Sequence, residues 1–221
     1  LSKKTLTGKK ILVSAGPTQE SIDPVRYITN HSSGKMGYAI AKAAFCLGAD
    51  VTLVSGPTYL KKPYGINCIN VVSADDMYQA IHEISKQQDF IIMSAAVGDY
   101  ASQNIADQKI KKNDHKMTLE LIKNKDILFD LGQKKLPQQI LCGFAMETSD
   151  LIEHAQDKLK KKNCDMIVAN HLKTDGAGFQ GDTNIVTFIT QDSMKDYGLL
   201  SKDELAYEIL MTLKKMEESL C

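Results

Sequence analysis

The segment that decides the fold runs from residue 10 to residue 54 and reads KILVSAGPTQESIDPVRYITNHSSGKMGYAIAKAAFCLGADVTLV. It opens with the apolar run Lys10–Ser14, which predicts a β-strand. Small and apolar side chains then recur with helical spacing through Gly34–Leu47, and Gly48 follows as a helix stop. A second β-branched run, Val51–Val54, predicts the next strand. A strand, a helix and another strand in this order are typical of a parallel α/β sheet.

The same alternation continues along the rest of the chain. Continuous apolar strands separated by helices indicate a sheet that is buried on both faces. The sequence therefore predicts a single α/β domain over residues 1–221, with a Rossmann-like, doubly wound, mainly parallel sheet. Further helices are expected at Ala74–Ser85 (capped by Ser73), Asp126–Leu131, Asp150–Lys162 and Lys202–Ser219, and further strands at Phe90–Met93, Ile140–Phe144, Met166–Ala169 and Asn184–Thr190, the last a candidate for a hairpin.

Residues 101–125 interrupt this alternation of strands and helices because they are polar and rich in lysine. Alternation at Lys116–Ile122 predicts one short strand within them. A solvated loop would account for the composition, but long insertions in compact domains are often lids over a site. We therefore predict a lysine-rich flap here.

Composition bounds the class of protein. Lys plus Arg and Asp plus Glu both number 27, so no net charge favours nucleic acid or an anionic membrane as a partner. No apolar run is long enough to span a bilayer. The five cysteines show no CxxC pair and no Cys/His cluster, which predicts free thiols in a reducing cytoplasm and makes a zinc site unexpected. Because the first residue is Leu1 and not Met, we expect a processed or excised fragment.

The connection after the first strand, residues 15–33, is unusually long. Strand-to-helix connections in such folds normally run about 2–6 residues. This one is stiffened by two prolines and ends in Ser32–Gly37 (SSGKMG), which opens a helix. A helix N-terminus attracts anions, although serines there are more often simple caps. Arg26 and Asn30 lie just upstream, and a guanidinium and an amide favour a carboxylate or phosphate ligand.

Two further regions carry chemical signals. The third strand ends in Ser94–Tyr100 (SAAVGDY), whose small residues permit close approach of a ligand; Asp99 there could cap an element or contact a nucleotide or its metal. Lysines gather at Lys109–Lys112 and at Lys158–Lys162. Most lysine runs are solvated faces, but Lys158 and Lys162 share one helix face and could reach one polyphosphate.

Several classes of site are disfavoured. The five histidines show no metal-ligand spacing, and the P-loop signature GxxxxGK[ST] is absent. An NAD(P)-binding Rossmann oxidoreductase is the strongest alternative from pattern alone. It requires GxGxxG in a tight first turn, whereas here that turn is long and contains prolines, and the second strand ends in Ser55-Gly56-Pro57.

The runs AGPTQESIDPVRYITNHSSGKMG (Ala15–Gly37), SAAVGDY, KIKK (Lys109–Lys112) and GFAMET (Gly143–Thr148) resemble the phosphopantothenoylcysteine synthetase family in the same order and with similar spacing. The resemblance covers nearly the whole chain. It implies a cytoplasmic ligase of coenzyme A biosynthesis that joins 4′-phosphopantothenate to L-cysteine. CTP and Mg²⁺ would be used, and an acyl-cytidylate would be the intermediate.

The resemblance also implies roles for individual residues. Asn30 would bind the acyl group, and Arg26 and Ala96 would contact phosphopantothenate alongside it. Lys109 would act in catalysis and nucleotide binding from the flap. The remaining nucleotide contacts would be Met93, Ser94, Ala95, Asp99, Lys125, Asp126, Ile127, Leu128, Phe144, Lys158 and Lys162. Metal ligands are not assigned.

Some features depart from the family or concern the whole protein. The family usually has NPD where this chain has Asn124-Lys125-Asp126, so a rigid turn is lost, and its alanine run contains Ser94 here. Family members are dimers, and Asn184–Thr190 could supply a pairing edge. The start, Leu6–Val13, resembles the junction to a fused flavin-dependent decarboxylase. A catalytically inactive regulatory module of the same fold remains an alternative.

Overall fold

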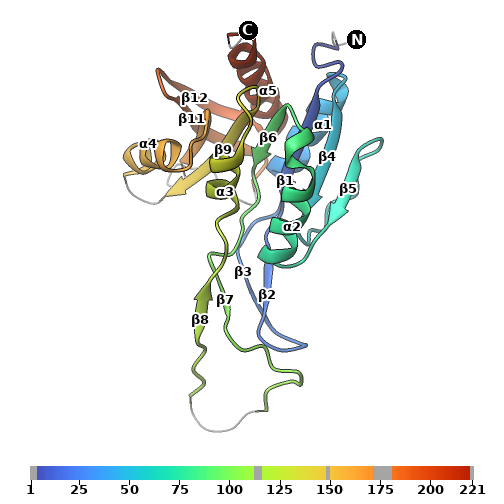
Figure 1. Cartoon of the computed structure of the whole chain (residues 1–221), viewed down its shortest axis with the longest axis vertical. Coiled ribbons are helices and arrows are strands. Elements are labelled where there is room, and N and C mark those ends of the chain that lie inside the picture. The colour runs from blue at the N-terminus through green and yellow to red at the C-terminus, as the bar shows by residue number, and fades with distance from the viewer. Residues whose placement is uncertain (1–3, 112–115, 148–149, 172–180, 220–221) are drawn as a thin grey trace.

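The computed structural model describes residues 4–111, 116–147, 150–171 and 181–219 of the 221. Within these residues an eight-stranded sheet carries helices on both faces, as predicted (Figure 1). Six neighbouring strands are parallel, and the last two run antiparallel to their neighbours. In spatial order the strands are β5 (Asn67–Asn70), β4 (Asp50–Ser55), β1 (Lys10–Ala15), β6 (Phe90–Met93), β9 (Ile140–Glu147), β10 (Met166–His171), β11 (Thr183–Thr190) and β12 (Met194–Ser201).

The strand order reverses next to β1. From β1 the chain moves outward to β4 and β5, and it then returns to β6 on the opposite side of β1. The two connections that leave β1 and β6 therefore diverge at the carboxyl ends of these strands. Ligands of open α/β sheets bind in the crevice that such a divergence creates.

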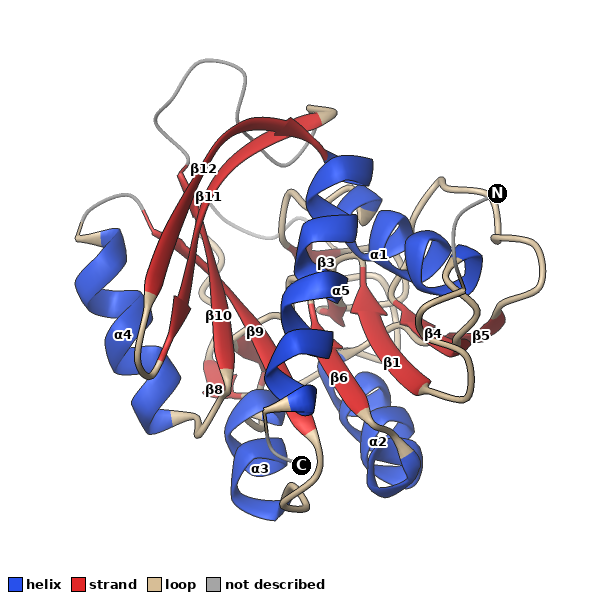
Figure 2. Cartoon of the chain, turned by 90° about the horizontal axis from the view of Figure 1, so that it is seen from above, coloured by secondary structure: helices blue, strands red, loops and turns tan. Residues whose placement is uncertain are grey.

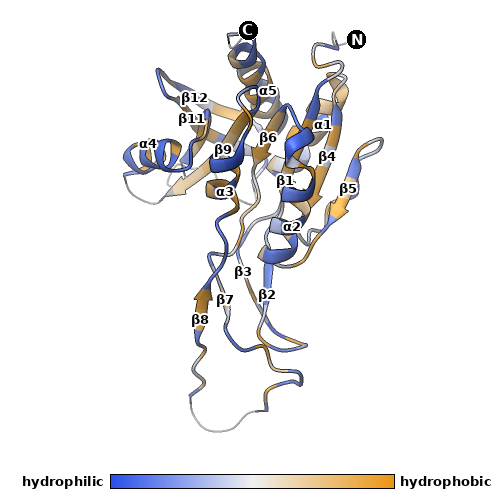
Figure 3. Ribbon diagram, in the orientation of Figure 1, coloured by the Kyte–Doolittle hydropathy of each residue, from blue (hydrophilic) through white to orange (hydrophobic). Residues whose placement is uncertain are grey.

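Two groups of helices cover the two faces of the sheet (Figure 2). Neighbouring residues of a strand point to opposite faces of the sheet and pack into two separate cores. Ile92 packs on the side of α1 and α5, and Ile91 packs on the side of α2, α3 and α4. The hydrophobic colouring is concentrated on the central strands, while α4 is largely hydrophilic (Figure 3). The helices are α1 (Lys35–Cys46), α2 (Ala74–Ile84, followed by a 3-10 turn at Ser85–Gln87), α3 (Ile127–Lys134), α4 (Leu151–Lys161) and α5 (Lys202–Glu218).

The predicted cap of α2 is confirmed. The Ser73 hydroxyl accepts a hydrogen bond from the Asp76 N–H at 3.1 Å, and the Asp76 carboxylate accepts one from the Ser73 N–H at 2.9 Å. This reciprocal box satisfies two helix donors that would otherwise be unpaired. None of the helices in the described ranges has the length and apolar character needed to cross a membrane.

Two narrow ribbons project away from the sheet below β1 and β6 (Figure 1). The first, β2 (Gln19–Ser21) and β3 (Tyr27–Thr29), is an antiparallel hairpin inside the long connection that follows β1. The second, β7 (Tyr100–Ser102) and β8 (Leu121–Lys123), forms the stem of the predicted flap. The short strand expected at Lys116–Ile122 is present but begins later, at Leu121, and ends at Lys123.

The prediction that Asn184–Thr190 offers a pairing edge is wrong. As β11, this strand bonds to β10 on one side and to β12 on the other, so neither of its edges is open. Its hairpin partner β12 forms the border of the sheet. Most side chains of β12 are exposed, and it lacks the apolar alternation that would have revealed it.

Candidate functional site

Short backbone contacts bind the loop after β1 to the segment after β6. Ala96 donates its N–H to the Gly16 carbonyl at 2.9 Å, and Thr18 donates to the Ala96 carbonyl at 3.3 Å. The Thr18 hydroxyl in turn accepts from the Gly98 N–H at 2.9 Å. Gly56 has no room for a side chain, because a Cβ there would overlap the Pro17 carbonyl. The two segments predicted to carry the site are therefore fixed against each other.

Asn30 reaches across this junction. Its amide Nδ2 donates to the Ala96 carbonyl at 3.1 Å and to the Val97 carbonyl at 3.2 Å. The neighbouring Thr29 hydroxyl donates to the Thr18 carbonyl at 2.7 Å, which holds the end of β3 in place. The structure thus brings Asn30 and Ala96, which are 66 residues apart in sequence, into direct contact.

Asp23 organises the tip of the first ribbon and joins it to the flap. Its buried carboxylate accepts from Arg26 Nε at 2.9 Å and Nη2 at 2.5 Å, and from the Ile110 N–H at 3.1 Å. Arg26 Nη2 also donates to the Ile110 carbonyl at 2.8 Å. The Arg26 guanidinium and the backbone N–H donors hold the pKa of Asp23 well below its usual range, against the effect of burial. Lys109 is exposed one residue from this contact.

A cavity of about 450 Å³ lies over the carboxyl ends of the strands. Arg26, Asn30 and Lys109 are not among its lining residues; Asn30 contacts the cavity wall through the Ala96 and Val97 carbonyls. The predicted residues that do line it come from the end of β6, the start of α3, β9 and α4. They are Met93, Ser94, Ala95, Ala96, Asp99, Lys125, Asp126, Ile127, Leu128, Phe144, Lys158 and Lys162.

The two α4 lysines in this wall already have partners. Lys158 Nζ donates to the Phe144 carbonyl at 2.7 Å, and Lys162 forms an ion pair with Asp126. Burial raises the pKa of Asp126, but the Lys162 ammonium and the Phe129 N–H outweigh it and lower the pKa overall. Asp126 also caps α3, so this pair ties α3 to α4. Both lysines line the cavity, and the polyphosphate role suggested for them stays a prediction.

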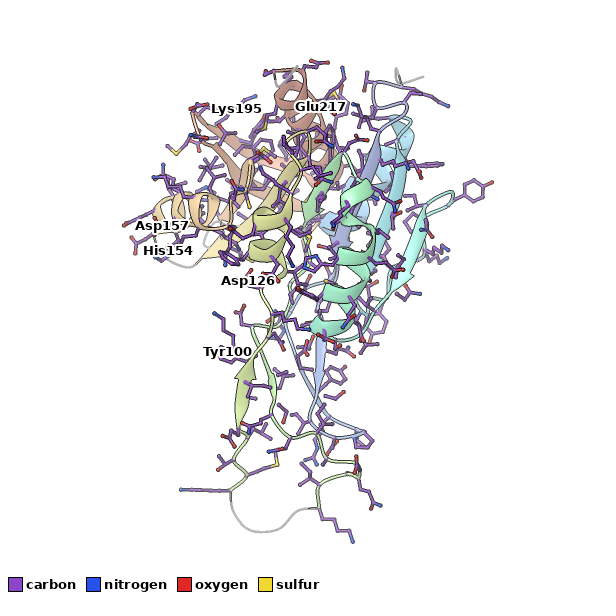
Figure 4. All side chains as sticks on the ribbon, in the orientation of Figure 1. Tyr100, Asp126, His154, Asp157, Lys195 and Glu217 are labelled. Atoms are coloured by element: carbon purple, nitrogen blue, oxygen red, sulfur yellow. The ribbon has the colours of Figure 1, made fainter. Side chains whose placement is uncertain are left out.

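Asn124 and Lys125 hold the turn where the family usually has a proline. Asn124 Nδ2 donates to the Gly98 carbonyl at 2.8 Å, and its N–H donates to the Asp99 carbonyl at 2.8 Å. Lys125 Nζ lies 2.7 Å from the Asp75 carboxylate and 4.8 Å from the centre of the Tyr78 ring. Asp126 follows directly at the top of the flap, above Tyr100 on the ribbon (Figure 4). Polar contacts thus replace the rigid turn.

Sequence reasoning missed three buried polar side chains in the cavity wall: Asn170, Asn184 and Lys202. All three are more than nine-tenths buried. Asn170 ends the apolar run of β10, and a polar residue at the carboxyl end of a buried parallel strand was an available signal. Asn184 lies in the predicted strand and Lys202 opens the predicted closing helix, but β12, which joins them, showed no local pattern in the sequence.

The model of the DNA/pantothenate metabolism flavoprotein C-terminal domain matches residues 6–216. The chain belongs to this family. It is 48% identical over 215 residues to the Coenzyme A biosynthesis bifunctional protein CoaBC of Bacillus subtilis, which covers 96% of this chain and 53% of that protein. The Vibrio parahaemolyticus CoaBC is 47% identical over 96% of this chain and 54% of its own length. The chain therefore spans about half the length of these curated relatives.

Solved structures agree with this assignment to the flavoprotein C-terminal domain family. The crystal structure of the C-terminal domain of a CoaBC protein has a TM-score of 0.84 and 43% identity, covering 98% of this chain and 100% of that one. A Cab2 mutant in complex with phosphopantothenate-cysteine has a TM-score of 0.78 at 17% identity, with 96% and 87% covered, which shows a shared fold. The matches favour this family over the oxidoreductase alternative.

Replacing Asp23 by Asn should loosen the contact between ribbon and flap. The variant keeps its size but loses the charge that pairs with Arg26, so we expect faster hydrogen exchange at the amides of Ile110 and Ala106, measured by mass spectrometry. Asp107→Asn, exposed on the same flap, is the matched control and should leave that exchange unchanged. Equal exchange in wild type and Asp23→Asn would contradict this anchoring role.

The same variant has a defined pH dependence. Because the pKa of Asp23 is depressed in the folded state, the stabilisation that its carboxylate contributes is fully present above its pKa in the unfolded chain, which is about 3.9. It is lost as pH falls through the folded pKa. Urea unfolding should therefore show wild type more stable than Asp23→Asn at pH 7, with the difference shrinking below about pH 4.

Proposed function

We propose that this chain joins 4′-phosphopantothenate to L-cysteine by activating the carboxylate with CTP. The observation that carries the proposal is the junction at Ala96. This residue lines the cavity, and its carbonyl accepts the Asn30 amide from the loop after β1. A group held by Asn30 would therefore lie beside a ligand that fills the cavity. Membership of the family and the CoaBC relatives support the same reaction.

The first step would form the mixed anhydride. A carboxylate oxygen of phosphopantothenate attacks the α-phosphorus of CTP, and the bond from that phosphorus to the bridging oxygen breaks, which releases pyrophosphate. Asn30, Ala96 and Arg26 would position the acyl substrate, with Nη1 of Arg26 available because Asp23 holds Nε and Nη2. Positioning of two reactants in this way replaces a bimolecular encounter.

In the second step the cysteine amine attacks the acyl carbon. The new C–N bond forms as the C–O bond to CMP breaks, and the amine loses a proton. Both N–H groups of the Asn30 amide bond to the Ala96 and Val97 carbonyls in this structure, so one of them would have to turn to the acyl oxygen, which gains negative charge, to favour this transition state. Lys109 is exposed on the flap, and its assignment as a catalytic residue stays a prediction.

Mg²⁺ would bind in this cavity together with the nucleotide phosphates, since the described wall offers too few carboxylates to hold it alone. Within the described ranges no three His, Cys, Asp or Glu side chains gather to hold a metal. Asp99 is one carboxylate of the wall, and Asp126 is already paired with Lys162. Mg²⁺ commonly binds through one or two carboxylates together with substrate phosphates. Such an ion would neutralise charge on the triphosphate during attack at phosphorus.

The test of the reaction is pyrophosphate release with purified protein. We expect release with CTP that requires phosphopantothenate, and amide formation that also requires cysteine. No turnover with either CTP or ATP would contradict the ligase proposal and leave an inactive module of this fold. Turnover with ATP alone would contradict only the assignment of CTP.

Asn30→Ala should impair the part of the site that holds the acyl substrate and leave the part that binds the nucleotide intact. The variant removes an amide at the acyl group, so we expect phosphopantothenate-dependent pyrophosphate release to fall by about a hundredfold, the lower end of the loss of one oxyanion donor. The dissociation constant of CTP, measured by calorimetry, should change by less than about twofold, because in this proposal Asn30 does not contact the nucleotide. A collapse of CTP binding would show that Asn30 serves the nucleotide instead.

We further propose that the chain is the C-terminal half of a cytoplasmic bifunctional protein with a flavin-dependent decarboxylase, as the name and length of its CoaBC relatives support. The cysteines in the described ranges are free thiols, which suits a reducing compartment.

The ribbons support a homodimer. They expose apolar side chains, including Val25 and Tyr27 on the first ribbon and Ile105 and Ile122 on the flap and its stem. Light scattering should give twice the 24.4 kDa chain mass. Ile122→Glu should lower that mass, whereas Tyr64→Glu, exposed outside the ribbons, should leave it unchanged. A monomeric wild type would contradict this assembly.

A further inference from the structure

A buried carboxylate, Glu20, lies in β2 at the base of the first ribbon, and the proposed reaction does not use it. The residue is only 5% exposed. Its Oε1 accepts a hydrogen bond at 2.9 Å from the backbone N–H of Ala74, the first residue of α2. In Figure 1 this start of α2 lies directly above β2. Burying a carboxylate is costly unless hydrogen bonds compensate it, so the position of Glu20 depends on this contact.

The start of α2 offers this carboxylate both a donor and a favourable field. Ala74 is 2% exposed, so water cannot replace Glu20 as the acceptor of its N–H. The capping box serves the N–H groups of Ser73 and Asp76, and that of Ala74 is left to Glu20. The positive end of the helix dipole also favours a negative charge here. Glu20 therefore completes the cap of α2 from a different element of the fold.

The same residue fixes the root of the ribbon that carries Asn30. Glu20 faces Ile28 in the ladder between β2 and β3, two residues before Asn30. The Gln19 N–H donates to the Val72 carbonyl at 2.8 Å, which is a second tie between β2 and the segment that leads into α2. Because β3 pairs with β2, the position of Asn30 follows from the attachment of β2 to this segment and to α2.

The Glu20 side chain also packs behind the wall of the cavity. A Cβ added at Gly98 would lie 3.3 Å from Glu20 Cγ and 3.5 Å from Glu20 Oε1. Gly98 lines the cavity, donates its N–H to the Thr18 hydroxyl and accepts the Asn124 side-chain amide at its carbonyl. Glu20 is not among the lining residues. It therefore sets the spacing between the ribbon and the wall without contacting a ligand in the cavity.

We propose that Glu20 is a positioning residue for the phosphopantothenate part of the site and acts on Asn30 through β2 and β3. The assignment rests on the proposed ligase reaction and adds a residue that touches neither substrate. Loss of the carboxylate would leave the Ala74 N–H without its acceptor and open space behind Gly98. The ribbon could then shift against the wall, and a misplacement of about 1 Å can cost about a hundredfold in rate.

The kinetic test compares Glu20→Ala and Glu20→Gln in the assay of pyrophosphate release. Glu20→Ala removes the acceptor, so we expect kcat/KM for phosphopantothenate to fall by about tenfold or more. Glu20→Gln keeps the shape and an oxygen that can accept from Ala74, so it should recover most of that loss. The dissociation constant of CTP should change by less than about twofold in both variants, because Gly98 keeps its bonds to Thr18 and Asn124.

Gln139→Ala is the matched control. Gln139 is 3% exposed, and its amide donates to the carbonyls of Ser85 and Gln88 after α2. It directly precedes β9, at the amino end of that strand, whereas the cavity lies over the carboxyl ends. Its loss should lower the unfolding temperature, as Glu20→Ala does, but leave kcat/KM for phosphopantothenate unchanged. Glu20→Asp is too short by one methylene and should lower kcat/KM as well, which keeps the test decisive if Glu20→Ala does not fold.

Hydrogen exchange of single amides, followed by NMR, tests the attachment without turnover. Glu20→Ala should reduce protection at the amides of Ala74 and Gln19, whereas Gln139→Ala should not. Unchanged protection in Glu20→Ala would overturn the assignment, as would equal losses of kcat/KM in Glu20→Ala and Gln139→Ala. No recovery in Glu20→Gln, or a parallel loss of CTP binding, would overturn it too. A wild type that shows reduced protection in Glu20→Ala but has no turnover would instead contradict the proposed function.

Discussion

The contact between the loop after β1 and the segment after β6 is the constraint on which the site depends. Gly16 and Thr18 exchange backbone hydrogen bonds with Ala96, and Gly56 gives them room by lacking a side chain. The two segments leave neighbouring parallel strands at the point where the strand order reverses. A long connection would normally be mobile, but here both of its ends are bonded to the segment after β6, at Gly16 and Thr18 and again at Asn30. That attachment places Asn30 at the border of the cavity.

Lysines line both sides of the cavity and are held by protein groups. On the α3 and α4 side, Asp126 pairs with Lys162, and the Phe144 carbonyl accepts from Lys158. On the α1 and α5 side, the Gly181 carbonyl accepts from Lys202, and the Asp182 charge raises the Lys202 pKa against the larger effect of burial. These contacts fix the positions of the three ammonium groups around the cavity.

Sequence patterns predicted the sheet and most helices because those elements are long, apolar and periodic. They predicted the cavity residues after β6 and on α4 only through resemblance, since small residues and lysines are ambiguous by themselves. Asp23 was missed because its importance comes from Arg26 and Ile110, and the latter is 87 residues away. The ribbon strands β2, β3 and β7 are only three residues long, too short for a period to emerge. Asn184 was placed in a strand, but its burial depends on β12, whose exposed side chains carry no core pattern.

The same contact shows how one cavity could serve two substrates. Ala96 lines the cavity, and its carbonyl accepts a hydrogen bond from the Asn30 amide. Under the proposed reaction, a carboxylate held by Asn30 would therefore approach a nucleotide in the cavity from the ribbon side. The long connection after β1 is the part of the fold that would let a nucleotide cavity accept a second substrate.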